Sequence, residues 1–110
     1  MSALGDILHY TLDVKQSFRS GYSPEEYLDV IGPLMTNVHL CDYTKDAAGF
    51  RWLLPGQGKY DFLSLFKKLR ELEYSGPLII EVYSNTYGEL EDVYRSYDYI
   101  SEMVDSVWSR

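Results

Sequence analysis

The fold is decided by the stretch Leu78-Ile79-Ile80-Glu81-Val82-Tyr83, in which one carboxylate interrupts a run of apolar and aromatic residues. A short, nearly continuous apolar run is typical of a strand that is buried on both faces of a parallel sheet. An unpaired carboxylate at such a place would cost on the order of several kcal/mol. We therefore expect Glu81 to have a positively charged partner, and Arg51 and a metal ion are the two candidates.

Two more strand-like stretches lie upstream of this one. They are Ile7-Leu8-His9-Tyr10-Thr11-Leu12 and Asn37-Val38-His39-Leu40-Cys41. Both are short and rich in residues that favour strands. His9 falls in the middle of its stretch, and we interpret it as structural.

Each strand is followed by a helix signal. The first is the capping sequence Ser23-Pro24-Glu25-Glu26, and the second is the N-cap Asp61 before an apolar stripe of helical spacing. The third helix is expected from about Glu89 to Trp108, with a core-facing stripe made of Leu90, Val93, Tyr94, Tyr97, Ile100, Val104 and Trp108. The resulting order β-α-β-α-β-α predicts an α/β fold with parallel strands.

The longest irregular stretch is expected between Asp42 and Lys59. A loop of that length inside a compact domain is usually functional or mobile.

Composition limits the function classes. The net charge of −7 and the scattered positions of the ten Lys and Arg residues argue against nucleic-acid binding, which requires a basic face. A single cysteine, Cys41, excludes an intrachain disulfide, and no apolar run approaches the ~20 residues of a membrane span. No signal peptide is recognised at the start, so we expect a cytoplasmic protein without a membrane partner.

A potential metal ligand lies near the carboxyl end of each predicted strand. These ligands are Asp13, His39 and Glu81. The carboxyl ends of parallel strands are where chemistry sits in α/β folds, and neighbouring strands are about 4.8 Å apart. Two alternatives stay open, since Asp13 would also cap the turn that follows it, and His39 would also serve as a hydrogen-bonded, half-buried histidine.

Four ordered segments resemble the xylose-isomerase-like barrel superfamily of sugar isomerases and epimerases. The family pattern is a strand ending in Leu-Asp, a strand reading Val-His-Leu-x-Asp, a Pro-Gly-x-Gly-x-x-Asp-Phe loop, and a strand reading Ile-Glu. The matching segments are Thr11-Leu12-Asp13, Asn37-Val38-His39-Leu40-Cys41-Asp42, Leu54-Pro55-Gly56-Gln57-Gly58-Lys59-Tyr60-Asp61-Phe62 and Leu78-Ile79-Ile80-Glu81-Val82-Tyr83. Each motif is weak alone, but the ordered set is specific and covers nearly the whole chain.

The resemblance implies that residues 1–110 form a single domain, a partial (β/α)8 barrel of three consecutive βα units. These would be the sixth, seventh and eighth units of the barrel. Asp13, His39 and Glu81 would match three of four ligands of a divalent metal such as Mn²⁺, Mg²⁺, Co²⁺ or Zn²⁺. The fourth family ligand is a glutamate on the preceding strand, which we expect to lie outside this chain, together with the other barrel strands.

The same resemblance assigns roles to individual residues. Glu81 would be one member of the acid–base pair that moves a proton next to a carbonyl. Gln16 stands where the epimerases often carry a substrate-contacting histidine, and Arg51 would contact an anionic or hydroxyl-rich substrate. Asp42 would orient the site from behind its ligands.

Three hypotheses follow. The first is a fragment or subunit of a metal-dependent sugar or sugar phosphate isomerase/epimerase, incomplete as one chain and completed by homo-oligomerisation or by a partner chain that supplies the missing barrel strands. The second is a non-catalytic binding or assembly module derived from that fold. The third is an unrelated small α/β domain in which the three polar residues are structural.

Overall fold

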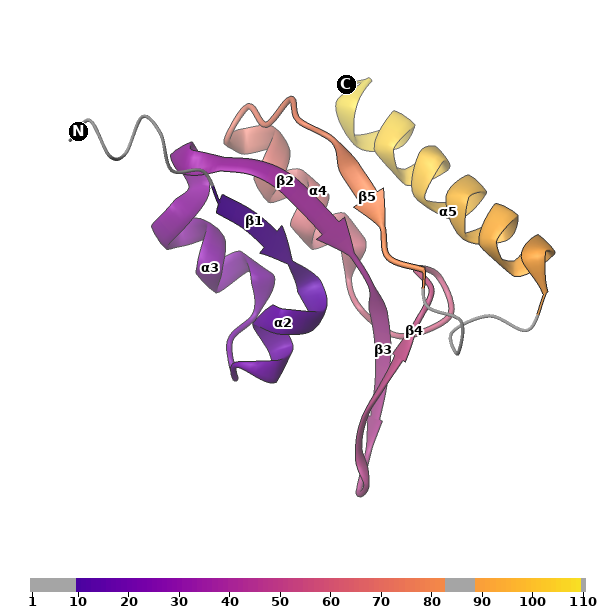
Figure 1. Ribbon diagram of the computed structural model, residues 1–110. Coiled ribbons are helices and arrows are strands. Elements are labelled where there is room, and N and C mark those ends of the chain that lie inside the picture. The colour runs from indigo at the N-terminus through magenta and orange to yellow at the C-terminus, as the bar shows by residue number, and fades with distance from the viewer. Residues whose placement is uncertain (1–9, 83–88, 110) are drawn as a thin grey trace.

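Three parallel strands form the central sheet of the protein (Figure 1). The computed structural model describes residues 10–82 and 89–109. The strands β1 (Tyr10–Asp13), β2 (Met35–Leu40) and β5 (Leu78–Ile80) pair in the order β1-β2-β5, and both pairings are parallel. The predicted α/β class with parallel strands is therefore confirmed, whereas its division into three consecutive barrel units stays a prediction. Residues 7–9 and Tyr83 of the predicted strands lie outside the described residues.

The helices alternate with these strands. They are α2 (Val14–Arg19), α3 (Pro24–Ile31), α4 (Phe62–Glu71) and α5 (Leu90–Trp108), with a short 3₁₀ turn at Gly32–Leu34. The predicted capping box of α3 is present, because the Ser23 hydroxyl accepts from the Glu26 backbone N–H and the Glu26 carboxylate accepts from that of Ser23. Asp61 caps α4 as predicted. Within the described residues, no helix is long and apolar enough to cross a membrane.

The core lies on one face of the sheet. Leu12, Val38 and Leu40 point to this face and are at most 1% exposed. They pack with the apolar stripe of α4, which consists of Phe62, Leu65, Phe66 and Leu69. Because side chains alternate along a strand, the residues that adjoin Leu12 on β1, and Val38 and Leu40 on β2, must point to the opposite face.

The predicted stripe of α5 is partly wrong. Ile100 is buried, but Leu90, Tyr94 and Tyr97 are 62–63% exposed. Ser96 lies inward in place of Tyr97, and its hydroxyl donates a 2.7 Å hydrogen bond to the Pro55 carbonyl. The close approach of the loop at Pro55 therefore sets which face of α5 is buried, and a periodicity argument cannot include that contact.

A β-hairpin replaces the irregular loop that was expected after the second strand. It comprises β3 (Asp42–Asp46) and β4 (Gly49–Leu53), which pair antiparallel, and it continues from the end of β2 away from the rest of the sheet (Figure 1). The expectation of an irregular stretch was wrong between Asp42 and Leu53. The turn residues Ala47 and Ala48 lack the Asn-Gly or Asp-Gly signal of a tight hairpin, and the φ of +115° that the turn needs is taken by Gly49.

One buried carboxylate organises the loop that returns from the hairpin to α4. Asp42 is 1% exposed, and its two oxygens accept backbone N–H groups from Tyr43, Gly56, Gly58 and Tyr60 at 2.8–3.0 Å. A Cβ on Gly58 would lie 2.3 Å from the Tyr43 carbonyl oxygen and 2.5 Å from an Asp42 oxygen, so no other residue fits there. The loop sequence Pro-Gly-x-Gly is thus a consequence of wrapping the backbone around one carboxylate.

Tyr60 ends this loop and is buried at 8% exposure. Its hydroxyl donates to the Glu25 carboxylate at 2.9 Å, which ties the loop to the first turn of α3. Burial, followed by the negative charge of Glu25, raises the pKa of the Tyr60 phenol far above its ordinary value.

Replacement of Asp42 by Asn tests the role of the buried carboxylate. The amide keeps one oxygen but turns an NH₂ group toward backbone donors, so we expect the free energy of unfolding to fall by roughly 3 kcal/mol. Asp46→Asn is the matched control, because Asp46 is exposed and its carboxylate accepts the backbone N–H of Ala48 in the hairpin turn. Urea unfolding followed by circular dichroism measures both variants, and equal losses would show that the Asp42 carboxylate does not hold the loop.

Replacement of Tyr60 by Phe tests the buried phenol. At neutral pH the lost hydrogen bond should lower the free energy of unfolding by about 1 kcal/mol. Above about pH 10 the unfolded wild-type chain releases the phenol proton while the folded chain retains it. The wild type should then lose up to ~1.4 kcal/mol of its advantage over Tyr60→Phe per pH unit.

Unfolding curves between pH 8 and pH 11 measure this convergence. Tyr94→Phe is the control, because Tyr94 is 63% exposed. A constant difference between wild type and Tyr60→Phe across the range would contradict the raised pKa.

Candidate metal centre

Three potential ligands from three strands converge at one end of the sheet. Asp13, His39 and Glu81 each offer one ligand atom, and these atoms lie within 4.8 Å of one another. All three side chains are half-buried. The structure therefore brings together the three residues that the sequence singled out as metal ligands.

Strand register produces this convergence. Asp13 ends β1 and pairs with His39 on β2, while His39 pairs with Ile79, two residues before Glu81. The Glu81 backbone N–H donates to the Leu40 carbonyl at 2.9 Å, which continues the parallel pairing beyond the last residue of β5. The side chains of Asp13, His39 and Glu81 point away from the core because their neighbours Leu12, Leu40 and Ile80 point toward it.

The hydrogen-bond partner of Glu81 is His39. Its Nδ1 lies 2.5 Å from Glu81 Oε1 and 3.8 Å from Asp13 Oδ2. A histidine thus satisfies the carboxylate for which Arg51 or a metal ion was expected. The alternative interpretation of His39 as a hydrogen-bonded, half-buried histidine describes this contact correctly, and the contact also places its ring beside both carboxylates.

Asp13 has two functions that use different oxygens. Oδ1 accepts the Gln16 backbone N–H at 2.9 Å and caps α2, a helix that we did not predict. Oδ2 faces His39. The capping interpretation of Asp13 is therefore correct and still leaves one oxygen available as a ligand.

The remaining predicted residues lie around this cluster in different ways. Gln16 is exposed in α2, and its backbone N–H donates to Asp13. Arg51 is exposed on β4 opposite Thr44. Asp42 is buried, and its carboxylate accepts backbone N–H groups of its own loop. It supports the loop behind the cluster, and its predicted influence on the ligands stays a prediction.

An aromatic group with lysines lies on the hairpin and was missed by sequence reasoning. Phe50 and Trp52 stack with ring centroids 4.9 Å apart and planes 12° apart. Lys15 Nζ lies 5.8 Å from the Trp52 ring centroid, and Lys45 Nζ lies 4.9 Å from that of Phe50. The signal was present as alternating aromatic residues in the unpredicted hairpin, but without the hairpin the rings had no common face.

The charge of Lys15 affects the thiol of Cys41, just after β2. Burial raises the pKa of the Cys41 thiol to about 11, and among the smaller influences Lys15 lowers this pKa while Asp13 raises it. Cys41 follows His39 by two residues. One lysine and one candidate ligand therefore act on the same buried thiol.

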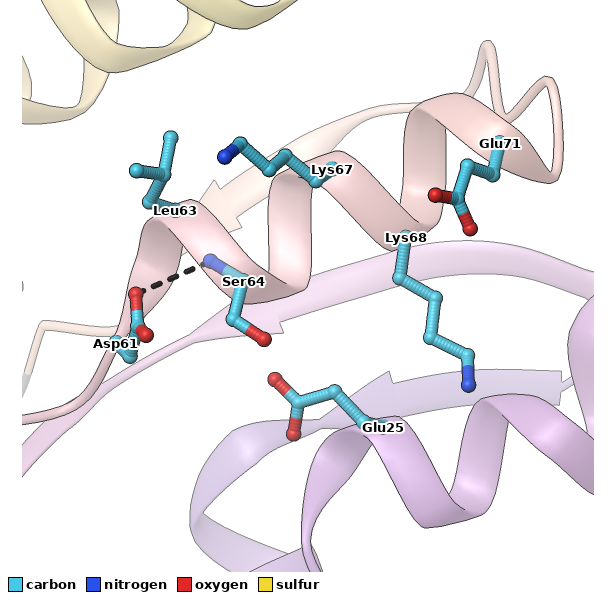
Figure 2. Close-up of a pocket in the computed structure, with 7 residues that line it drawn as sticks. All are labelled: Glu25, Asp61, Leu63, Ser64, Lys67, Lys68 and Glu71. Atoms are coloured by element: carbon cyan, nitrogen blue, oxygen red, sulfur yellow. Dashed lines mark hydrogen bonds between the residues drawn. The ribbon is translucent and has the colours of Figure 1, made fainter.

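A hollow on the described surface lies away from these three residues. It measures about 510 Å³ and is lined by residues of α3 and α4 or just before α4, with Lys67, Lys68 and Glu71 on one side and Glu25 on the other (Figure 2). Lys68 forms an ion pair with Asp29 on α3. The hollow contains both signs of charge and none of the three candidate ligands, so it is separate from the candidate metal centre.

The cluster fits one divalent cation. Two donors on opposite sides of an ion at roughly 2.0–2.3 Å are about 4–4.6 Å apart, and the separations of these three atoms, which are within 4.8 Å, have an upper limit slightly above that range. A donor set of two carboxylates and one imidazole suits Zn²⁺, Mn²⁺, Co²⁺ and Mg²⁺ to different degrees. Ligands bind a metal in deprotonated form, so a cation would replace the proton between His39 and Glu81.

Comparisons with known proteins identify a family that is consistent with the parallel α/β sheet. The chain is 30% identical over 91 residues to inosose dehydratase from Geobacillus kaustophilus (strain HTA426), an alignment that covers 69% of this chain and 30% of that protein. The chain thus spans under a third of the length of this relative. A family model described as xylose isomerase-like TIM barrel matches residues 4–103. The chain belongs to the xylose isomerase-like TIM-barrel family.

Proposed function

We propose that this chain is the metal-holding part of a sugar or sugar phosphate isomerase/epimerase-like enzyme. The observation that carries the proposal is the convergence of Asp13, His39 and Glu81 on one face of the sheet, at the carboxyl ends of the strands. Family membership supports a sugar-related small molecule as the substrate class. A divalent cation held by these residues would polarise a carbonyl group and stabilise the negative charge that develops on its oxygen.

Glu81 is the proposed acid–base residue. Its carboxylate is half-buried beside His39, and a positioned carboxylate can take a proton from the carbon next to a carbonyl group. His39 would hold Oε1 of Glu81 in a defined orientation through the 2.5 Å contact. Gln16 and Arg51 are the proposed substrate contacts, and both are exposed near the carboxyl end of the sheet.

The rest of the barrel would complete this site. β1 and β5 are the two edge strands of the three-stranded sheet. Among the described residues, no strand pairs with the outer side of either one, so a further strand can pair there. Apolar side chains gather next to the β5 edge, with Ile79 40% and Val82 44% exposed. We propose that additional strands cover these edges and supply the second proton-transfer residue, from the rest of a longer chain, a second copy or a partner.

Metal binding tests the ligand set. We expect wild-type protein to bind about one Mn²⁺ or Co²⁺ per site, and His39→Ala to weaken binding by at least ~10–100-fold, the loss typical of removing even a supporting residue. Electron paramagnetic resonance of Mn²⁺ measures free and bound ion. Asp46→Asn, which removes a carboxylate on the hairpin, should bind as the wild type does, and equal binding by all three proteins would exclude the cluster as the site.

Proton exchange separates the enzyme from a non-catalytic binding module. With Mn²⁺ or Co²⁺ added, we expect the complete assembly to exchange the hydrogen next to the carbonyl of a ketose with D₂O, followed by proton NMR. Glu81→Gln should slow this exchange by roughly 10²–10⁴-fold, because an amide cannot accept the proton. Glu71→Gln, an exposed change on α4, is the control. Metal binding without any exchange in the wild type would favour the binding module.

A further inference from the structure

A local concentration of positive charge lies at the hairpin in a chain whose net charge is −7. Three lysines from three segments each lie against one ring of the same aromatic group. Lys15 lies by Trp52, Lys45 by Phe50, and Lys59 by Tyr43, with Nζ-to-centroid distances of 4.9–5.8 Å. Rings of these residues contact one another, and Phe18 of α2 packs against Tyr43 at 4.6 Å.

Lys15 is the member of this set that lies next to a candidate metal ligand in the sequence. It follows Asp13 by two residues, in the helix that Asp13 caps. The half-buried side chain extends to the Trp52 ring, and cation–π attraction restricts where its ammonium group can lie.

The charge balance of the centre explains why such a cation matters. Asp13 and Glu81 together supply two negative charges, and one divalent cation offsets them. An anionic group elsewhere on a substrate then needs a separate positive charge to offset its loss of hydration. Lysine provides this as a compact ammonium group with three donors, the form in which it commonly binds phosphate.

We propose that Lys15, held against Trp52, binds the anionic group of the substrate and selects a phosphorylated or carboxylated sugar over a neutral one. The proposal rests on the proposed function, because it assumes that the sugar's carbonyl end lies at Asp13, His39 and Glu81. It assigns the selecting charge to Lys15 rather than to Arg51. Arg51 is next to Trp52 on β4, so by strand alternation it points to the opposite face of the hairpin.

Three probes that share one carbon skeleton test the inference. D-glucose, D-gluconate and D-glucose 6-phosphate are titrated into the protein at constant ionic strength, and NMR follows the indole N–H of Trp52. We expect saturable shifts with one or both anions and a response to D-glucose at least ~10-fold weaker. A response to gluconate as strong as that to the phosphate would identify charge alone as the selected feature, whereas a response to the phosphate only would identify the phosphate group.

Variants locate the effect on one residue. Lys15→Met should weaken binding of the responding anion by at least ~10-fold, and Lys15→Arg should retain most of it. Lys67→Met, an exposed lysine of α4, is the matched control. Unchanged affinity in Lys15→Met, or equal binding of all three probes by the wild type, would overturn the inference.

The Mn²⁺ measurement keeps the two proposals distinguishable. If Lys15→Met retains Mn²⁺ binding and loses the anion, both proposals are supported. If the wild type binds Mn²⁺ but Lys15→Met binds the anion normally, only the assignment of Lys15 fails. If the wild type binds no Mn²⁺, the proposed function fails, and the anion titration still decides whether Lys15 selects charge. Circular dichroism of each variant confirms that the fold is retained, and Lys15→Arg decides the result if Lys15→Met unfolds.

Discussion

The alternation of side chains along β2 is the constraint on which the rest of the structure depends. Val38 and Leu40 are fully buried against the helices, and His39 between them points to the other face. A shift of one residue would place the imidazole in the core and expose two apolar side chains. The same alternation holds for Leu12 beside Asp13 and for Ile80 beside Glu81, so the pairing that buries the core also gathers the polar cluster.

Hydrogen bonds of the polar cluster shape its chemistry. Glu81 has its hydrogen-bond partner in His39, while one oxygen of Asp13 is used to cap α2. Burying a carboxylate without such partners would be strongly unfavourable. A cation that enters must therefore compete with a proton for the His39–Glu81 pair, and the same contact orients both side chains before any ligand arrives.

Local patterns predicted those parts of the structure whose causes are local. The side chains of Ser23 and Asp61 cap their helices by accepting the backbone N–H three residues later, and both caps were predicted correctly. The three candidate ligands were found because parallel strands place their carboxyl ends together. The roles of these ligands stay predictions, since the convergence of side chains does not by itself identify what they bind.

The elements that were missed depend on contacts between distant residues. The hairpin pairs Tyr43 with Trp52 and turns at two alanines, so its turn has no strong local signal. The buried face of α5 includes Ser96, because its hydroxyl donates a hydrogen bond to the carbonyl of Pro55, 41 residues earlier in the chain. Helix α2 was missed because it follows β1 without a break, although Asp13 and Gln16 have the spacing of a capping pair.

The two missed elements together change how the site is understood. Without α2 and the hairpin, the candidate centre consists of three ligands at the end of a sheet, with no neighbouring structural element beside them. With them, Phe18 packs on Tyr43, and Lys15 lies by Trp52, so the helix after the first ligand is joined to the hairpin after the second. In the proposed function, the hairpin would contact the part of a substrate remote from its carbonyl. Lys45 of the hairpin, with Lys15 and Lys59 beside it, would give that surface a charge opposite to that of the carboxylate ligands.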